Sequence, residues 1–179
     1  PGDYGGVALS EIISGEVNPT GRLPFTWPKH ASSHIPYFRK HTENIHTDFS
    51  LNAFNPQFNF GDGLSYCQAS IDSITIDKSS YLIDDTIELT VSVSNKSDCD
   101  ATEIIQVYIS DLVASITPSV ERLRHYKKVN IGPNETVDFA MRIPLKDLGF
   151  IGIDNSYVIE SGRFKIRVNT FSKTFDLIK

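Results

Sequence analysis

The chain has 179 residues, of which 40% are hydrophobic and 22% are charged, and its formal net charge is −5. This balance is typical of a globular protein, and the length allows one domain with additions or two small domains. The basic residues form no long run, so neither nucleic acid nor an anionic membrane surface is an expected partner. No apolar stretch approaches the ~18 residues that a membrane-spanning helix needs.

The first 28 residues predict one helix and one short extended segment. Between Asp3 and Gly15 apolar residues recur at three- and four-residue spacing, and Gly15 suits the left-handed conformation that ends many helices. Residues 18–21 are typical of a turn, and residues 22–28, with two prolines, indicate an irregular strand at a sheet edge. Because these pieces cannot enclose a core, we expect them to expose apolar faces that pack on other domains.

Residues 29–66 show no clear periodicity, although they hold four of the five histidines. A stretch this long without regular structure is uncommon inside a compact domain, so we interpret it as a linker that packs across a domain surface. Aromatic side chains would be its anchors: Tyr37, Phe38, Phe49, Phe54, Phe58, Phe60 and Tyr66. Stacking of Trp27 and these aromatics on sugar rings is the alternative, and interdomain packing is favoured.

From about residue 70 the hydrophobic period becomes two. Ile87, Leu89, Val91 and Val93 alternate with polar residues, as in a half-buried strand. About seven such runs, separated by turn signals over roughly 110 residues, indicate a β-sandwich. The expected core includes Ile74, Leu89, Val91, Val107, Phe139, Met141, Phe164 and Val168.

Two long strings carry a resemblance to a known family. The line from Pro1 to Pro28, with Asn-Pro-Thr-Gly-Arg-Leu-Pro inside it, closely resembles the end of the α/β sandwich domain of family 3 glycoside hydrolases. The string Phe-Gly-Asp-Gly-Leu-Ser-Tyr at residues 60–66 resembles the entry into that family's C-terminal domain. Asp62 stands where the family often has an aromatic residue, and Asn169 stands where a glycine commonly follows the strand valine. Strands of that C-terminal domain are resembled by residues 103–111, 123–129, 148–150 and 158–162.

The resemblance implies a mainly β protein. Residues 67–179 would form a fibronectin type III-like or immunoglobulin-like β-sandwich. Residues 1–66 would be the tail of an α/β sandwich domain, with one helix, one short strand and a long loop or linker. Because the chain begins with Pro1 and no Met, we interpret it as part of a longer parent protein. The sequence does not identify the compartment of that parent, for which the periplasm and secretion are the two alternatives.

The resemblance also implies that the parent is a retaining β-glycosidase of the β-glucosidase type. Its nucleophilic aspartate would lie in an N-terminal barrel and its acid/base glutamate upstream of Pro1; retaining cleavage needs both carboxyl groups about 5–5.5 Å apart. This chain is then a structural part without catalytic residues, cofactor or metal. Its partners would be the parent's own barrel and α/β sandwich domains, and substrate would bind through the parent.

Two other classes of function remain as alternatives. One is a stand-alone fibronectin-like module that binds carbohydrate or cell wall, and the other is a generic immunoglobulin-like adhesion or chaperone domain. Residues 1–28 argue against both, because a free module has no use for a segment that cannot fold alone.

Several residues in the loops are candidates for chemistry. Asp62, between two glycines, could reach a substrate, but aspartate is also a favoured turn residue, and we expect the turn. His30 and His34 have the i,i+4 spacing of metal ligands on a helix, yet the prolines on either side argue for a loop. His41 and His46 are expected to be solvated. Asp48 and Asp62 are the only loop carboxylates that are plausible candidates for catalysis, and neither has an evident partner in the sequence.

Three further features have readings that depend on their surroundings. Ser65 lacks the following glycine of a nucleophile elbow and is expected to be structural. Asn95-Lys-Ser and Asn134-Glu-Thr fit the glycosylation sequon, both at predicted turns. Cys67 and Cys99 could form one bridge, but the sequence cannot show whether their Cβ atoms are close and aligned.

Overall fold

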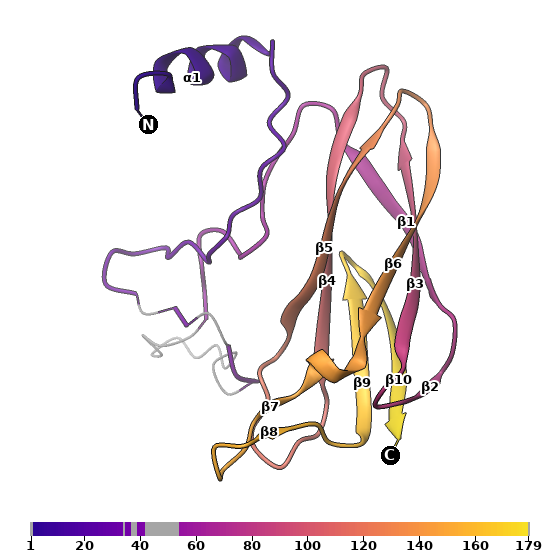
Figure 1. Ribbon diagram of the computed structural model, residues 1–179. Helices are drawn as coiled ribbons and strands as arrows, with labels where there is room; N and C mark the ends of the chain where they lie inside the picture. Colours follow the sequence, from indigo (N-terminus) through magenta and orange to yellow (C-terminus); the bar gives the residue numbers. More distant parts are fainter. Residues whose placement is uncertain (1, 34, 37–38, 42–53, 179) are drawn as a thin grey trace.

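A computed structural model of the chain describes residues 2–33, 35–36, 39–41 and 54–178. It consists of a β-sandwich and of an arm, by which we mean the described residues between 2 and 66. Figure 1 shows the arm leaving one side of the sandwich, with helix α1 (Gly5–Ser14) near its outer end. None of the described helices has the length and apolar character needed to cross a bilayer. Outside the described residues lie His34, Tyr37, Phe38, His46, Asp48 and Phe49.

The sandwich is made of two main sheets. In chain order its strands are β1 (Ala69–Ile76), β2 (Ser80–Leu82), β3 (Thr86–Asn95), β4 (Ala101–Asp111), β5 (Arg122–Ile131), β6 (Thr136–Pro144), β7 (Phe150–Ile151), β8 (Tyr157–Val158), β9 (Gly162–Val168) and β10 (Phe171–Ile178), with a 3₁₀ turn at Leu145–Leu148. One sheet has the order β1-β3-β6 and the other has the order β2-β10-β9-β4-β5. The β7–β8 pair forms a small ribbon at one end (Figure 1).

The core lies between the two sheets because each central strand turns alternate apolar residues inward. Of the eight core residues expected from the sequence, seven are buried, at 4% exposure or less, and Phe139 is half-buried against the same cluster. Phe175 of β10 links the neighbouring strands of its sheet within the core, with its ring stacked on Phe164 of β9 at 5.5 Å and edge-on to Tyr81 of β2 at 5.6 Å. The mainly β sandwich expected from the period of two is confirmed.

Helix α1 ends as the sequence predicts. Gly15 follows it with φ of 83°, and its N–H donates to the Ile12 carbonyl at 3.1 Å. No residue of α1 is buried. The helix is therefore at most partly covered by the described residues, in contrast to the central strands of the sandwich.

Candidate interdomain interface

The arm returns to the sandwich through an irregular two-stranded pairing. The Leu23 N–H donates to the Asp62 carbonyl at 2.8 Å, and the Gly61 N–H donates to the Leu23 carbonyl at 2.8 Å. Farther along, Trp27 and Phe58 form an isolated bridge. Residues 22–28 are thus extended but irregular, as their two prolines lead us to expect, and they pair with the other limb of the arm.

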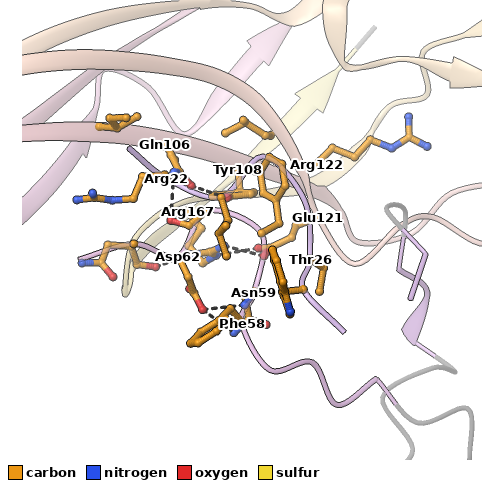
Figure 2. A pocket seen from close by; sticks show the side chains of 18 of the residues that line it. Arg22, Thr26, Phe58, Asn59, Asp62, Gln106, Tyr108, Glu121, Arg122 and Arg167 are labelled. Atoms are coloured by element: carbon orange, nitrogen blue, oxygen red, sulfur yellow. Dashed lines mark hydrogen bonds and ion pairs between the residues drawn. The ribbon is translucent and has the colours of Figure 1, made fainter. Parts of the chain in front are cut away.

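A groove of about 1060 Å³ separates this pairing from the outer face of strands β4, β5 and β9. Figure 2 shows charged residues of both sides lining it. Arg22 of the arm reaches Glu103 of β4 with both carboxylate oxygens within 3.2 Å, and both side chains are mostly buried. This ion pair fastens the arm to the sheet.

A second ion pair, between Arg167 and Glu121, lies on the sandwich side of the groove. Arg167 of β9 donates to both oxygens of Glu121 at 2.7 and 2.6 Å, and its guanidinium lies 4.4 Å above the ring of Tyr108 (Figure 2). The bidentate geometry fixes both side chains. The arginines therefore hold both of these carboxylates as structural anchors.

Gly61 lets the arm approach the sheet closely. Its φ is 86°, and a Cβ there would lie 2.8 Å from the Tyr108 hydroxyl and still closer to the amide of Gln106. The Gly61 carbonyl accepts from Gln106 at 3.4 Å, and the ring of Phe60 meets that of Tyr108 edge-on at 6.3 Å. Phe60 thus provides one of the aromatic anchors expected of the linker.

Asp62 forms a turn, as expected from its setting between two glycines. Its Oδ2 accepts the backbone N–H of Asn59 at 2.7 Å and the Asn59 side-chain amide at 3.4 Å (Figure 2). The aspartate caps the loop locally. These contacts give a physical reason for an aspartate at this position.

The other loop candidates are not assembled into a site. His30 and His41 are both exposed, and no group of three or more histidines, cysteines or acidic residues gathers in the described part of the chain. Ser65 is buried at 7% exposure, and its hydroxyl has no hydrogen-bond partner among the described residues. A nucleophilic serine would need a neighbouring base.

Asp111 and Glu160 are two interacting carboxylates that no sequence motif singles out. Burial raises the pKa of Asp111, the N–H of Val113 opposes this, and the charge of Glu160 adds to it. Raised carboxyl pKa values occur at catalytic sites, but each of these two accepts a backbone N–H of the following loop, from Val113 at 3.2 Å and from Ser115 at 2.8 Å. The pair secures that loop.

The junction between arm and sandwich depends on Asn18. Its Oδ1 accepts the N–H groups of Tyr66 and Cys67 at 2.8 and 3.4 Å, and its Nδ2 donates to the Cys67 carbonyl at 3.2 Å. Cys67 is also joined to Cys99 by a disulfide, with the Cα atoms 6.1 Å apart. The question left open by the sequence is thus answered, since folding brings the two cysteines together.

The arm exposes several large apolar side chains. On α1, Val7, Leu9 and Ile13 are 56%, 59% and 72% exposed. Phe25 and Trp27, with ring centroids 5.4 Å apart, are each nearly half exposed. Together these residues form a surface suited to another protein domain.

Comparison with known proteins agrees with this arrangement. Residues 1–66 match the family model of the glycosyl hydrolase family 3 C-terminal domain, and residues 103–172 match that of the fibronectin type III-like domain. A lysosomal beta glucosidase of Dictyostelium discoideum is 34% identical over 94% of the chain, and a putative beta-xylosidase of Formosa agariphila is 30% identical over 95%. The chain spans 21% and 22% of their lengths.

Solved structures resemble the arm and the sandwich together. A β-glucosidase involved in saponin metabolism from intestinal bacteria gives a TM-score of 0.90 at 30% identity, over 99% of this chain and 25% of that one. A β-glucosidase from Erythrobacter marinus gives 0.86 at 27% identity, over 97% and 24%. The chain therefore belongs to glycoside hydrolase family 3, whose C-terminal region with its fibronectin type III-like domain it comprises.

Proposed function

We propose that this chain is a non-catalytic accessory region that braces the catalytic domains of a retaining β-glycosidase, of the β-glucosidase type. The observation that carries the proposal is helix α1, which has no buried residue and exposes the apolar side chains of Leu9 and Ile13. A helix of ten residues is marginal in water without tertiary packing. A barrel and the rest of an α/β sandwich domain are the partners that would cover it.

The contacts between arm and sandwich support a bracing role. The Arg22–Glu103 ion pair, the close approach at Gly61 and the Asn18 junction all hold the arm in one place on the sandwich. The likeness to longer β-glucosidases covers 97–99% of the chain, arm included. A rigid arm of this kind would transmit the position of one domain to another.

The acidic residues of the groove support a catalytic centre elsewhere. Glu103 and Glu121 pair with arginines, and Asp62 caps its own loop. Retaining cleavage needs one ionised nucleophile and one protonated acid about 5–5.5 Å apart. Carboxylates that are held by arginines or by their own loop in this way are not positioned as such a pair.

Activity assays test this absence of catalysis. The purified chain, and beside it Asp62→Asn, would be incubated with a panel of chromogenic β-glycosides. We expect no turnover by either protein. Turnover that Asp62→Asn abolishes would overturn the accessory role and place an active carboxylate in the groove.

A chimera tests the bracing role itself. This chain would replace the corresponding C-terminal quarter of the Erythrobacter marinus β-glucosidase. We expect Leu9→Glu with Ile13→Glu to lower the thermal stability and aryl β-glucosidase activity of the chimera, because two charges would be buried in the interface. Ser10→Glu, an exposed position on the same helix, is the matched control. Equal stability and activity of all three chimeras would contradict docking through α1.

Carbohydrate binding by the free chain is the second candidate, and the stacked Phe25–Trp27 pair favours it. Their exposed faces could stack on sugar rings. Titration with cello- and xylo-oligosaccharides separates the two functions. Binding that Trp27→Ala removes would favour a carbohydrate-binding module, and the accessory role predicts none.

A further inference from the structure

The two glycosylation sequons have opposite environments at one end of the sandwich. Asn95 is the last residue of β3 rather than a turn residue as expected, and Asn134 lies in the turn between β5 and β6. We propose that Asn134 is an acceptor of an N-linked glycan in a eukaryotic secretory pathway, and that Asn95 carries no glycan in the folded chain.

Asn95 uses its whole amide inside the protein. The residue is 1% exposed, and its Nδ2 lies 2.7, 3.1 and 3.0 Å from the carbonyl oxygens of Cys99, Ile131 and Gly132. Its Oδ1 accepts from the N–H and the hydroxyl of Ser97. A glycan on Nδ2 would replace one hydrogen and leave buried carbonyls without a donor, which is costly. The fold and a glycan on Asn95 exclude each other.

Asn134 is exposed, with φ of 54°. Its Nδ2 makes one recorded hydrogen bond, to Asp98 Oδ1 at 3.3 Å, and one N–H remains for the glycosidic link. Glu135 turns back to accept the Gly132 N–H at 2.8 Å, and Thr136 is exposed at the start of β6. The triplet is thus open to solvent at all three positions, as surface acceptor sites are.

The disulfide supplies a second, independent observation. Disulfides persist in oxidising compartments, among them the lumen of the endoplasmic reticulum, where N-linked glycans are added. The Cys67–Cys99 bridge closes the same loop that receives the Asn95 amide. The groove under the arm is lined by none of residues 132–136, so a glycan on Asn134 leaves it open.

The test is secretion of the full chain from cultured eukaryotic cells, with peptide mass spectrometry before and after removal of N-glycans by an amidase. We expect one glycan, on the peptide that contains Asn134. Thr136→Val should abolish it, and Thr136→Ser should retain it. A secreted, folded chain without a glycan on Asn134, or with one on Asn95, would overturn the proposal.

A second measurement separates burial from local sequence preference. The chain is translated with microsomes in the presence of a thiol reductant, so that the disulfide does not form and folding is impaired. We then expect a second glycan, on Asn95, which Ser97→Ala removes. If Asn95 stays unmodified under these conditions, burial is not what protects it and that half of the proposal fails.

Discussion

The sandwich and the arm are stabilised in different ways. In the sandwich, residues such as Leu89, Val107 and Ile166 are completely buried between two sheets. In the arm, helix α1 has no buried residue, and the contacts to the sandwich are mostly hydrogen bonds, with one ion pair between Arg22 and Glu103. Apolar burial dominates folding free energy, so we expect the sandwich to fold by itself. Polar contacts are directional and fix the arm's position without giving it a core of its own.

The largest difference between the two regions should appear on truncation of an apolar side chain. Phe175→Ala should lower the free energy of unfolding by about 3–5 kcal/mol, because its ring packs on both Phe164 and Tyr81. Leu9→Ala on α1 should stay within about 0.5 kcal/mol in this chain. Urea unfolding followed by far-ultraviolet circular dichroism measures both changes in the free energy of unfolding. Equal effects would mean that α1 is packed in solution.

The disulfide lies at the boundary and should contribute next. Cys67→Ser with Cys99→Ser should cost about 2–4 kcal/mol of sandwich stability, because the bridge closes a loop with a sequence separation of 32. Treatment of the unmodified chain with reductant should have the same effect and should leave the double variant unchanged. A reductant without effect on the unmodified chain would show that the bridge does not form.

Loosening the arm alone is the third test. Arg22→Ala should raise hydrogen exchange at the amides of Leu23 and Gly61 about tenfold or more, since a charged hydrogen bond is worth about 1.5–3 kcal/mol. Amides of β3 should be unaffected. Arg142→Ala, which breaks an exposed pair with Glu88, is the matched control and should change exchange in the arm by nothing measurable. Exchange that rises throughout the chain would mean that arm and sandwich unfold as one unit.

The smallest effect concerns acid and is confined to the sandwich. Burial opposes ionisation of Asp77, but hydrogen bonds from the Tyr81 hydroxyl and the Glu88 N–H outweigh it and lower the pKa of Asp77. A depressed folded-state pKa stabilises above the unfolded value of about 3.9 and loses that contribution as pH falls through the folded value. Melting temperatures of the unmodified chain and of Asp77→Asn should therefore differ at neutral pH and converge in acid. A difference that grows toward low pH would contradict this.

Much of the sandwich could be predicted because its central strands alternate. Strand β5 gave no such signal, since residues 122–128 are half-buried or exposed and only Val129 and Ile131 reach the core. β5 is an edge strand that lines the groove next to the arm. Residues on its outer face are partly covered there, so buried and exposed positions do not alternate along the first part of the strand. The family resemblance, rather than the alternation, indicated a strand there.

Part of the interface could be predicted as well. The exposed apolar helix and the turn at Asp62 follow from spacing and turn chemistry. Asn169 has a positive φ of 52°, a conformation that asparagine adopts more readily than most residues other than glycine. The Arg22–Glu103 pair could not be foreseen, because 81 residues separate its members. Nor could the pairing of Cys67 with Cys99 be predicted, because it depends on the register between β1 and β3, which places Ala69 opposite Asn95.

The amide of Asn18 ties the first part of the arm to the point where the chain enters the sandwich. Its oxygen accepts the N–H groups of Tyr66 and Cys67, and its nitrogen donates to the Cys67 carbonyl. The Tyr66 hydroxyl in turn donates to the Ile12 carbonyl at the end of α1. A domain docked on α1, at the outer end of the arm (Figure 1), would therefore be connected to the sandwich through directional polar contacts rather than through a shared apolar core.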